Sequence, residues 1–248
     1  MSDQFAAPAP AAVDPFVVAA QLEGIPSAFA ATRDGIDALL RDRGLRRTTP
    51  EDTARSLLLG AAATASLEGG SVVDAETLRE GGGDTTARSA LRLSTELLGL
   101  VPTWRAAPLQ ALARLHALAA SGSVGPDELG RPVVNAGRLT ELATRVRAGS
   151  EAPALVLAAL VHAEVSDAGA FVSHNGVVAR AAERLVLVER GVDPASVTVP
   201  EAGHAAEPEG YRRALAAYGR GDAAGVQQWL QYASQAQARG AESSPLNR

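Results

Sequence analysis

The sequence has no cysteine and no lysine, and it has few aromatic residues. The absence of cysteine excludes disulfide bonds, thiol nucleophiles and cysteine-ligated zinc, and it suits a reducing compartment. Aromatic residues make up 4% of the chain and hydrophobic residues 46%. The core must therefore consist of alanine, leucine and valine. Because alanine and leucine are the strongest helix formers, this composition favours closely packed helices.

Long apolar runs and strongly basic segments are also missing. No segment approaches the roughly 20 apolar residues that span a bilayer, so a membrane partner is not expected. The net charge is −5, with 23 basic and 28 acidic residues, and nucleic acid is therefore not an expected partner. The N-terminus has neither a basic segment nor an apolar core of the signal-peptide kind. We expect a cytoplasmic protein.

The length of 248 residues suits a single domain. Residues 1–14 are rich in alanine and proline and are expected to be disordered, and residues 240–248 are expected to form a flexible tail. Between them, residues 15–239 are expected to form one all-α domain, with at most one short β-hairpin. Helical spacing and breaker residues predict helices at 26–43, 50–67, 84–100, 102–120, 137–148, 153–166, 175–190, 207–220 and 223–239.

Two of the predicted helices are apolar almost all round, at 153–166 and 175–190, and such helices belong at the centre of a domain. The loop between them ends in Asn175-Gly176. Unpaired N–H groups at a helix start attract anions, and Gly176 would let a phosphate approach the backbone closely. Arg180, one turn further on, can bind the same phosphate. The alternative is an Asn-Gly turn without a ligand.

The loop and its flanking helices resemble the motif of the Fic (Fido) family, His-Pro-Phe-x-(Asp/Glu)-Gly-Asn-Gly-Arg-x-x-Arg. Phe171, Asn175, Gly176 and Arg180 match positions of this motif. The resemblance extends over residues 53–232, where Tyr211, Leu215, Asp222 and Trp229 follow the rhythm of the family's C-terminal helices. It implies a Fic-type helical fold and a nucleotide such as ATP as the ligand of the matching residues.

Upstream of the motif, Thr64-Ala-Ser-Leu-Glu68-Gly69 resembles the inhibitory motif of the family, (Ser/Thr)-x-x-x-Glu-(Gly/Asn). The resemblance implies that Glu68 pairs with Arg180 and blocks productive nucleotide binding. We therefore predict a salt bridge between Glu68 and Arg180. Its role is either retained inhibition or a structural ion pair that fixes the first long helix on the core.

The motif also departs from the family. The family's catalytic histidine falls on Gly169, and glycine cannot act as a base. The acidic magnesium ligand falls on Ser173, so magnesium is not expected. A cradle glycine falls on His174, which is predicted to fill the space beside Asn175 and Gly176. The motif proline and first arginine fall on Ala170 and Val177. No catalytic residue is therefore assigned, and only His174 or Asp167 lies near enough to replace the base.

Three hypotheses follow. The first is a catalytically degenerate Fic-like protein, a regulator that binds a nucleotide or an unknown protein partner. The second is an active nucleotidyl or phosphoryl transferase with an altered site that Glu68 inhibits. The third is a helical structural protein. Val226, Trp229 and Leu230 are assigned to the core, with a homodimer interface as the alternative. The histidines show no metal-binding spacing: His116 and His162 are predicted to be core residues and His204 to lie in a polar loop.

Overall fold

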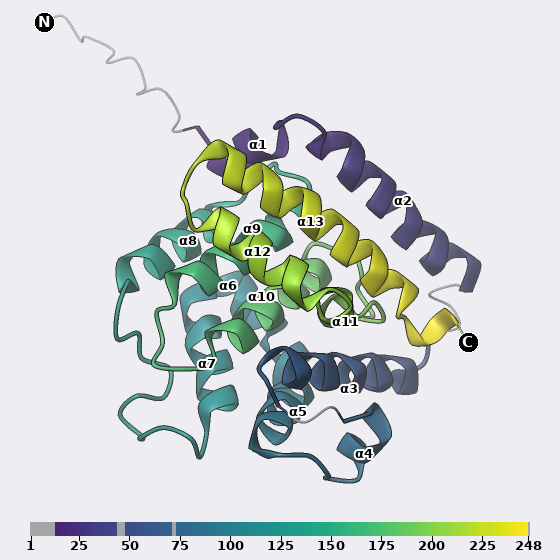
Figure 1. Cartoon of the computed structure of the whole chain (residues 1–248), viewed down its shortest axis with the longest axis vertical. Coiled ribbons are helices and arrows are strands. Elements are labelled where there is room, and N and C mark those ends of the chain that lie inside the picture. Colours follow the sequence, from purple (N-terminus) through teal and green to yellow (C-terminus); the bar gives the residue numbers. More distant parts are fainter. Residues whose placement is uncertain (1–12, 44–47, 71–72, 248) are drawn as a thin grey trace, which may run out of the picture.

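The computed structural model describes residues 13–43, 48–70 and 73–247 (Figure 1). These residues form helices and no strand, which confirms the predicted all-α fold class. In chain order the elements are α1 (Pro15–Ala20), α2 (Ile25–Arg43), α3 (Pro50–Leu67), α4 (Ala75–Arg79), α5 (Thr85–Leu97), the 3-10 turn η1 (Leu98–Leu100), α6 (Val101–Ala106), α7 (Pro108–Ala120), α8 (Ala136–Ala148), α9 (Ala154–Ala168), α10 (Asn175–Glu189), α11 (Pro200–Ala205), α12 (Pro208–Tyr218), α13 (Ala223–Glu242) and η2 (Pro245–Asn247).

Helices α9 and α10 form the centre of the domain, as their apolar sequences predict. Every residue from Val177 to Leu187 on α10 is buried, including three charged side chains. Helix α13 crosses one side of the pair and packs against α2, and α3 to α5 lie at the other end of the domain (Figure 1). The loop between α9 and α10 is therefore anchored at both ends in the buried centre of the domain.

Local sequence explains why α3 begins and ends where it does. Thr49 and Asp52 form a reciprocal capping box, and Pro50 occupies the first turn. The helix ends at Leu67, Glu68 is its C-cap residue, and Gly69 follows with a φ of 76°. Only glycine adopts such a φ without strain, so Gly69 stops the helix and leaves Glu68 at its end.

A buried arginine attaches α3 to the central pair. Arg184 on α10 donates to Glu201 Oε1 at 2.8 Å, to Ser56 Oγ of α3 at 2.9 Å and to Ser196 Oγ at 2.9 Å. A Cβ atom at Gly60 would lie 2.9 Å from both Arg184 Nη2 and Glu201 Oε2. The small residue on α3 therefore makes room for the ion pair, and the pair fixes α3 on α10 and α11.

Helices α11 and α13 touch backbone to backbone. A Cβ atom at Gly203 would lie 1.8 Å from the carbonyl oxygen of Ala236, and a Cβ at Gly240 would lie 2.9 Å from the oxygen of Val199. The amide of Val199 also donates to the carbonyl of Gly240 at 2.9 Å. Glycine is therefore required at both positions because a side chain would prevent the close contact of α11 with α13, and not because of an unusual backbone angle.

The structure differs from the predicted helices in several places. Three short helices, α1, α4 and α11, were not predicted, and the helix expected at 102–120 divides at Ala107, since Pro108 begins α7. The prediction that His204 lies in a polar loop was wrong, because it is fully buried on α11. Pro200 starts that helix and Gly203 brings it against α13, so the histidine faces inward.

The ends and the expected hairpin also differ. Residues 131–138 form no strand; instead the amides of Val133 and Val134 both donate to the carbonyl of Ala170, at 2.8 and 3.3 Å. At the C-terminus α13 continues past residue 239 to Glu242, and Ser244 is buried. The N-terminal segment expected to be disordered falls almost entirely outside the described residues. Among the described helices, none combines the length and the hydropathy that a membrane span requires.

We predict that Gly203→Ala lowers the free energy of unfolding by roughly 1–3 kcal/mol, because the added methyl group forces α11 away from α13. Gly35→Ala on α2 is the control, since nothing lies within 4 Å of a Cβ placed there. That change should stabilise the protein by roughly 0.5–1 kcal/mol through the lost flexibility of glycine in the unfolded chain. Urea unfolding followed by circular dichroism measures both. Equal stabilities of the two variants would contradict the close contact.

Candidate functional site

The loop between α9 and α10 is held closed by its own side chains. The Oδ1 atom of Asn175 accepts from the amide of Phe171 at 3.0 Å, and its Nδ2 atom donates to the carbonyl of Phe171 at 2.8 Å. The Phe171 ring is buried and stacks on His116 with 4.3 Å between centroids. Asn175 and Phe171 therefore hold the loop in shape, and their predicted contact with a ligand stays a prediction.

Gly169, which the resemblance aligns with the family's catalytic histidine, lies at the end of α9. Gly169 is the C-cap residue, with a φ of 52°. A Cβ atom there would meet no heavy atom closer than 3.9 Å, so the position has space but favours glycine by its backbone. Of the two residues that could replace the base, Asp167 pairs with Arg138 at 2.8 Å. The carboxylate of Asp167 is thus engaged by a cation rather than free.

The predicted ion pair between Glu68 and Arg180 is present, with 2.5 Å between Glu68 Oε1 and Arg180 Nη2. Arg180 is only 1% exposed. Its other nitrogens donate to Thr64 Oγ1 at 3.3 Å and to the Tyr211 hydroxyl at 3.2 Å. The C-terminal end of α3 and the second turn of α10 are therefore joined through one buried guanidinium.

The Glu68 carboxylate also lies against the backbone of Gly176. A Cβ atom at Gly176 would lie 2.5 Å from Glu68 Oε1. The start of a helix attracts anions, and the carboxylate lies beside the second residue of α10, next to the residues for which the sequence predicts a phosphate. The group that fills this space was predicted to be His174, whereas the contact of Gly176 is with Glu68.

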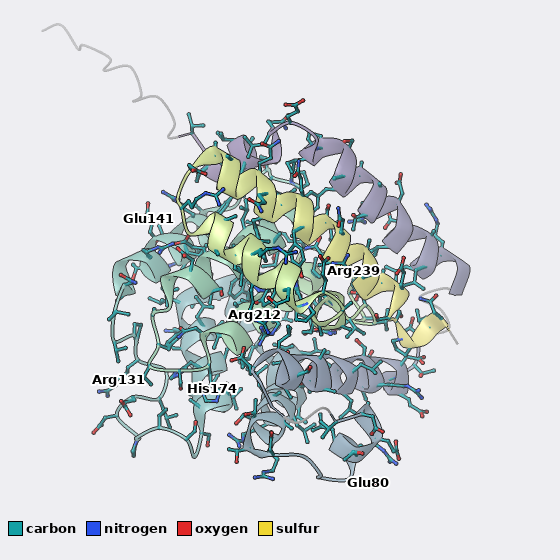
Figure 2. All side chains as sticks on the ribbon, in the orientation of Figure 1. Glu80, Arg131, Glu141, His174, Arg212 and Arg239 are labelled. Carbon is teal, nitrogen blue, oxygen red and sulfur yellow. The ribbon has the colours of Figure 1, made fainter. Side chains whose placement is uncertain are left out.

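His174 is the last residue before α10, with a φ of 59°. Its Nδ1 atom lies 2.7 Å from Ser173 Oγ, and the ring is partly buried. In Figure 2 it lies in the lower part of the molecule, below Arg212. Burial lowers the pKa of His174, and the Glu68 carboxylate opposes this effect. The imidazole is therefore mainly neutral near pH 7.

Behind the ion pair, the five helices α9 to α13 bring together a buried polar cluster that sequence reasoning missed. Glu183 Oε2 lies 2.6 Å from His162 Nδ1 and 3.0 Å from His204 Nε2, and its Oε1 accepts from Gln237 at 2.9 Å. His162 Nε2 in turn lies 2.8 Å from the Tyr211 hydroxyl. The prediction that His162 is a core residue is confirmed, since it is fully buried. A glutamate within the apolar sequence of α10 was the signal that could have revealed the cluster.

The electrostatics of this cluster are set by burial. Burial by itself would raise the pKa of Glu183, but the two imidazoles and their hydrogen bonds hold it well below its usual range. Burial lowers the pKa of His162 to about 4, against the opposing effect of Glu183. At neutral pH the cluster therefore contains an ionised carboxylate and a neutral His162.

Of the described residues, His162, Glu183 and His204 are the group whose donor atoms could hold a metal ion, since these atoms lie within 4.8 Å of one another. A bound ion would need nitrogen and oxygen ligands at about 2.0–2.2 Å. Here one carboxylate oxygen already lies within hydrogen-bond distance of both imidazoles. The arrangement fits a hydrogen-bonded carboxylate, and the donors do not fit an ion without rearrangement.

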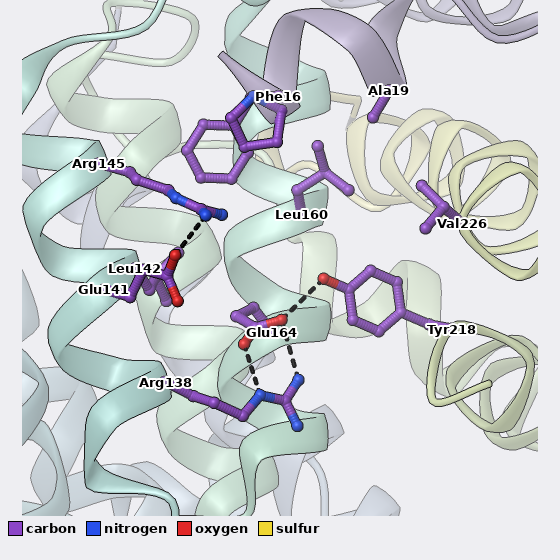
Figure 3. Close-up of a pocket in the computed structure, with 11 residues that line it drawn as sticks. Phe16, Ala19, Arg138, Glu141, Leu142, Arg145, Leu160, Glu164, Tyr218 and Val226 are labelled. Atoms are coloured by element: carbon purple, nitrogen blue, oxygen red, sulfur yellow. Dashed lines mark hydrogen bonds and ion pairs between the residues drawn. The ribbon is translucent and has the colours of Figure 1, made fainter. Parts of the chain in front are cut away.

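A separate cavity of about 180 Å³ lies among α1, α8, α9, α12 and α13 (Figure 3). On its floor Glu164 accepts from Arg138 Nε at 2.8 Å and from the Tyr218 hydroxyl at 2.9 Å. Arg138 also reaches Asp167 at the end of α9. The charged groups of this cavity pair with one another, and none of the residues assigned to the loop motif lines it.

The pKa of His162 predicts a dependence of stability on pH. Its folded-state value is lowered from 6.5 to about 4, so between these values the unfolded chain binds a proton that the folded chain does not. The free energy of unfolding should therefore fall as the pH falls through this window, by at most about 1.4 kcal/mol per pH unit. Glu183 adds to the loss of stability at lower pH. Its pKa is lower in the folded chain than in the unfolded chain, so the ionised carboxylate stabilises the fold above the unfolded-state pKa, and this contribution is lost as the pH falls.

His162→Gln should flatten this slope by about one proton equivalent, because the amide keeps a donor and an acceptor but does not titrate. Chemical unfolding at pH 7, 6 and 5 measures the slope. His174→Gln is the control, and its effect should be smaller since that ring is only partly buried. An unchanged slope in His162→Gln would show that His162 is not neutral in the fold.

Comparisons with known proteins agree on the fold. No family model matches the sequence, and no curated protein matches it. Among solved structures, a Fic family protein from Desulfovibrio desulfuricans G20 is similar, with a TM-score of 0.66 and 17% identity over 94% of this chain and 76% of that chain. Fic-1 (residues 134–508) from C. elegans is similar with a TM-score of 0.65 and 14% identity over 88% of this chain and 70% of that chain. This chain therefore has the fold of Fic family proteins.

Proposed function

We propose that this protein is a Fic-like regulator that binds the phosphate groups of a nucleotide such as ATP, under the control of Glu68, and does not transfer AMP. A cytoplasmic setting and a protein partner that senses the bound state belong to the same proposal. The observation that carries it is the Glu68 carboxylate, which lies against Gly176 and pairs with Arg180.

A carboxylate at this place supports an anion site. The start of α10 and a guanidinium favour any group with negatively charged oxygens, and phosphate offers the same kind of oxygen as Glu68. Glu68 is the C-cap residue of α3 and its side chain is 30% exposed. The side chain can therefore leave Arg180 by rotation without unfolding α3, and an external phosphate can take its place.

The motif lacks two groups that the resemblance assigns to AMP transfer, the base and the magnesium ligand. Gly169 supplies no base, and Ser173 replaces the carboxylate that would hold magnesium. Asp167 is paired with Arg138. His174 is the remaining candidate base, and its lowered pKa favours the neutral form that a base needs. An active transferase that uses His174 is therefore the second candidate function.

Glu68→Gly should strengthen ATP binding at least about tenfold, because it removes the internal competitor for Arg180. Isothermal titration with ATP, with and without magnesium, measures the affinity of the wild type and the variant. Glu80→Gly is the matched control: Glu80 is the C-cap of α4 and precedes a glycine of positive φ, as Glu68 does. In Figure 2, Glu80 lies at the bottom of the molecule, below and to the right of His174. No binding in folded Glu68→Gly would refute the phosphate site.

Transfer is tested separately with ATP labelled in its α-phosphate. Neither the wild type nor Glu68→Gly should become labelled or label an added cell extract, because the base and the metal ligand are absent. Label incorporation by Glu68→Gly that disappears in Glu68→Gly/His174→Gln would establish the transferase alternative instead.

A further inference from the structure

Arg180 has partners on two sides, and the rotation of Glu68 away from it removes the charged partner on one side. Glu68 and Thr64 of α3 contact Nη2 and Nε, whereas Tyr211 of α12 contacts Nη1. A guanidinium that is 1% exposed is costly without partners, because it has lost its water. The proposed exchange of Glu68 for a phosphate therefore requires a partner that keeps Arg180 in place.

The direction of each hydrogen bond on the Tyr211 side follows from the donors. Arg180 can only donate, so the Tyr211 oxygen accepts and its own proton must go to another group. That group is His162 Nε2 at 2.8 Å. The proton of the neutral imidazole then lies on Nδ1, which donates to Glu183 Oε2 at 2.6 Å. All three hydrogen bonds between Arg180 and Glu183 therefore run in the same direction, from donor to acceptor.

The end of this chain is a fixed negative charge. The Glu183 side chain is 1% exposed, and its carboxylate also accepts from His204 and Gln237. Hydrogen bonds in such a chain polarise one another, so the carboxylate makes the Tyr211 oxygen a better acceptor for a cation. Burial raises the pKa of Tyr211, and the hydroxyl keeps the proton that it donates to His162.

We propose that Tyr211 is a positioning residue, oriented through His162 by Glu183, that holds Arg180 toward the start of α10 when Glu68 is displaced. The inference rests on the proposed function, since it concerns the same anion site. It assigns the buried cluster a role in the site: the cluster supplies the contact of Arg180 that does not depend on α3.

The variant Tyr211→Phe isolates this contact. It keeps the ring, which lies 6.0 Å from the guanidinium carbon, and removes only the hydroxyl. Tyr218→Phe is the matched control. Tyr218 is on the same helix, and its hydroxyl also donates a hydrogen bond, to the carboxylate of Glu164 at 2.9 Å. The two variants lose the same atom, but only Tyr211 contacts Arg180.

Both changes are introduced into Glu68→Gly, and ATP and tripolyphosphate are titrated into each protein. Tyr211→Phe should weaken binding of both ligands at least about tenfold, as expected for loss of a contact that places a charged hydrogen-bond donor. Tyr218→Phe should change it less than about twofold. Equal affinities of Glu68→Gly and Glu68→Gly/Tyr211→Phe would overturn the positioning role.

The Nη1–H signal of Arg180 in the NMR spectrum tests the role without any ligand, because Nη1 is the nitrogen that contacts Tyr211. In Glu68→Gly it should remain sharp and protected from exchange, and in Glu68→Gly/Tyr211→Phe it should broaden or disappear. If Glu68→Gly fails to bind either ligand, the proposed function fails, and the Arg180 signal still decides the positioning role. An Arg180 signal that stays sharp in the double variant would overturn the inference whether or not nucleotide binds.

Discussion

The structure depends on the compensation of charges buried on one helix. Arg180, Glu183 and Arg184 lie within the central helix α10 and are almost inaccessible to water. Each must receive partners from other elements, because a buried charge without them is strongly unfavourable. Glu68 of α3 and Glu201 of α11 supply the opposite charges, and His162 of α9 binds the carboxylate. The packing of these helices around α10 therefore depends on paired charges as well as on the apolar core.

The same compensation explains the state of the loop site. Arg180, to which we assign phosphate binding in the proposed function, is paired with Glu68 and links α3 to α10. Asn175 keeps the loop in shape by hydrogen bonds to Phe171. The residues of the proposed anion site therefore also stabilise the fold.

The sequence predicted the elements that local pattern controls and missed those that packing controls. Helices α9 and α10 are rich in apolar residues, so their central place was evident, and the pairing of Glu68 with Arg180 followed from the resemblance. Helix α11 has only six residues and packs against α13. A contact between distant segments leaves no periodic pattern in the sequence from which it could be predicted. The roles of Glu183 and His204 depend on the packing of several helices against one another, and tertiary contacts between distant segments determine that packing.

The contacts of α3 with α10 recur at intervals of one helical turn. Ser56, Gly60, Thr64 and Glu68 face the two arginines, which are themselves four residues apart. A slide of α3 by four residues, about 6 Å, would separate Glu68 from Arg180 only by also breaking the buried bond of Ser56 to Arg184. These contacts therefore fix α3 in one axial register relative to α10.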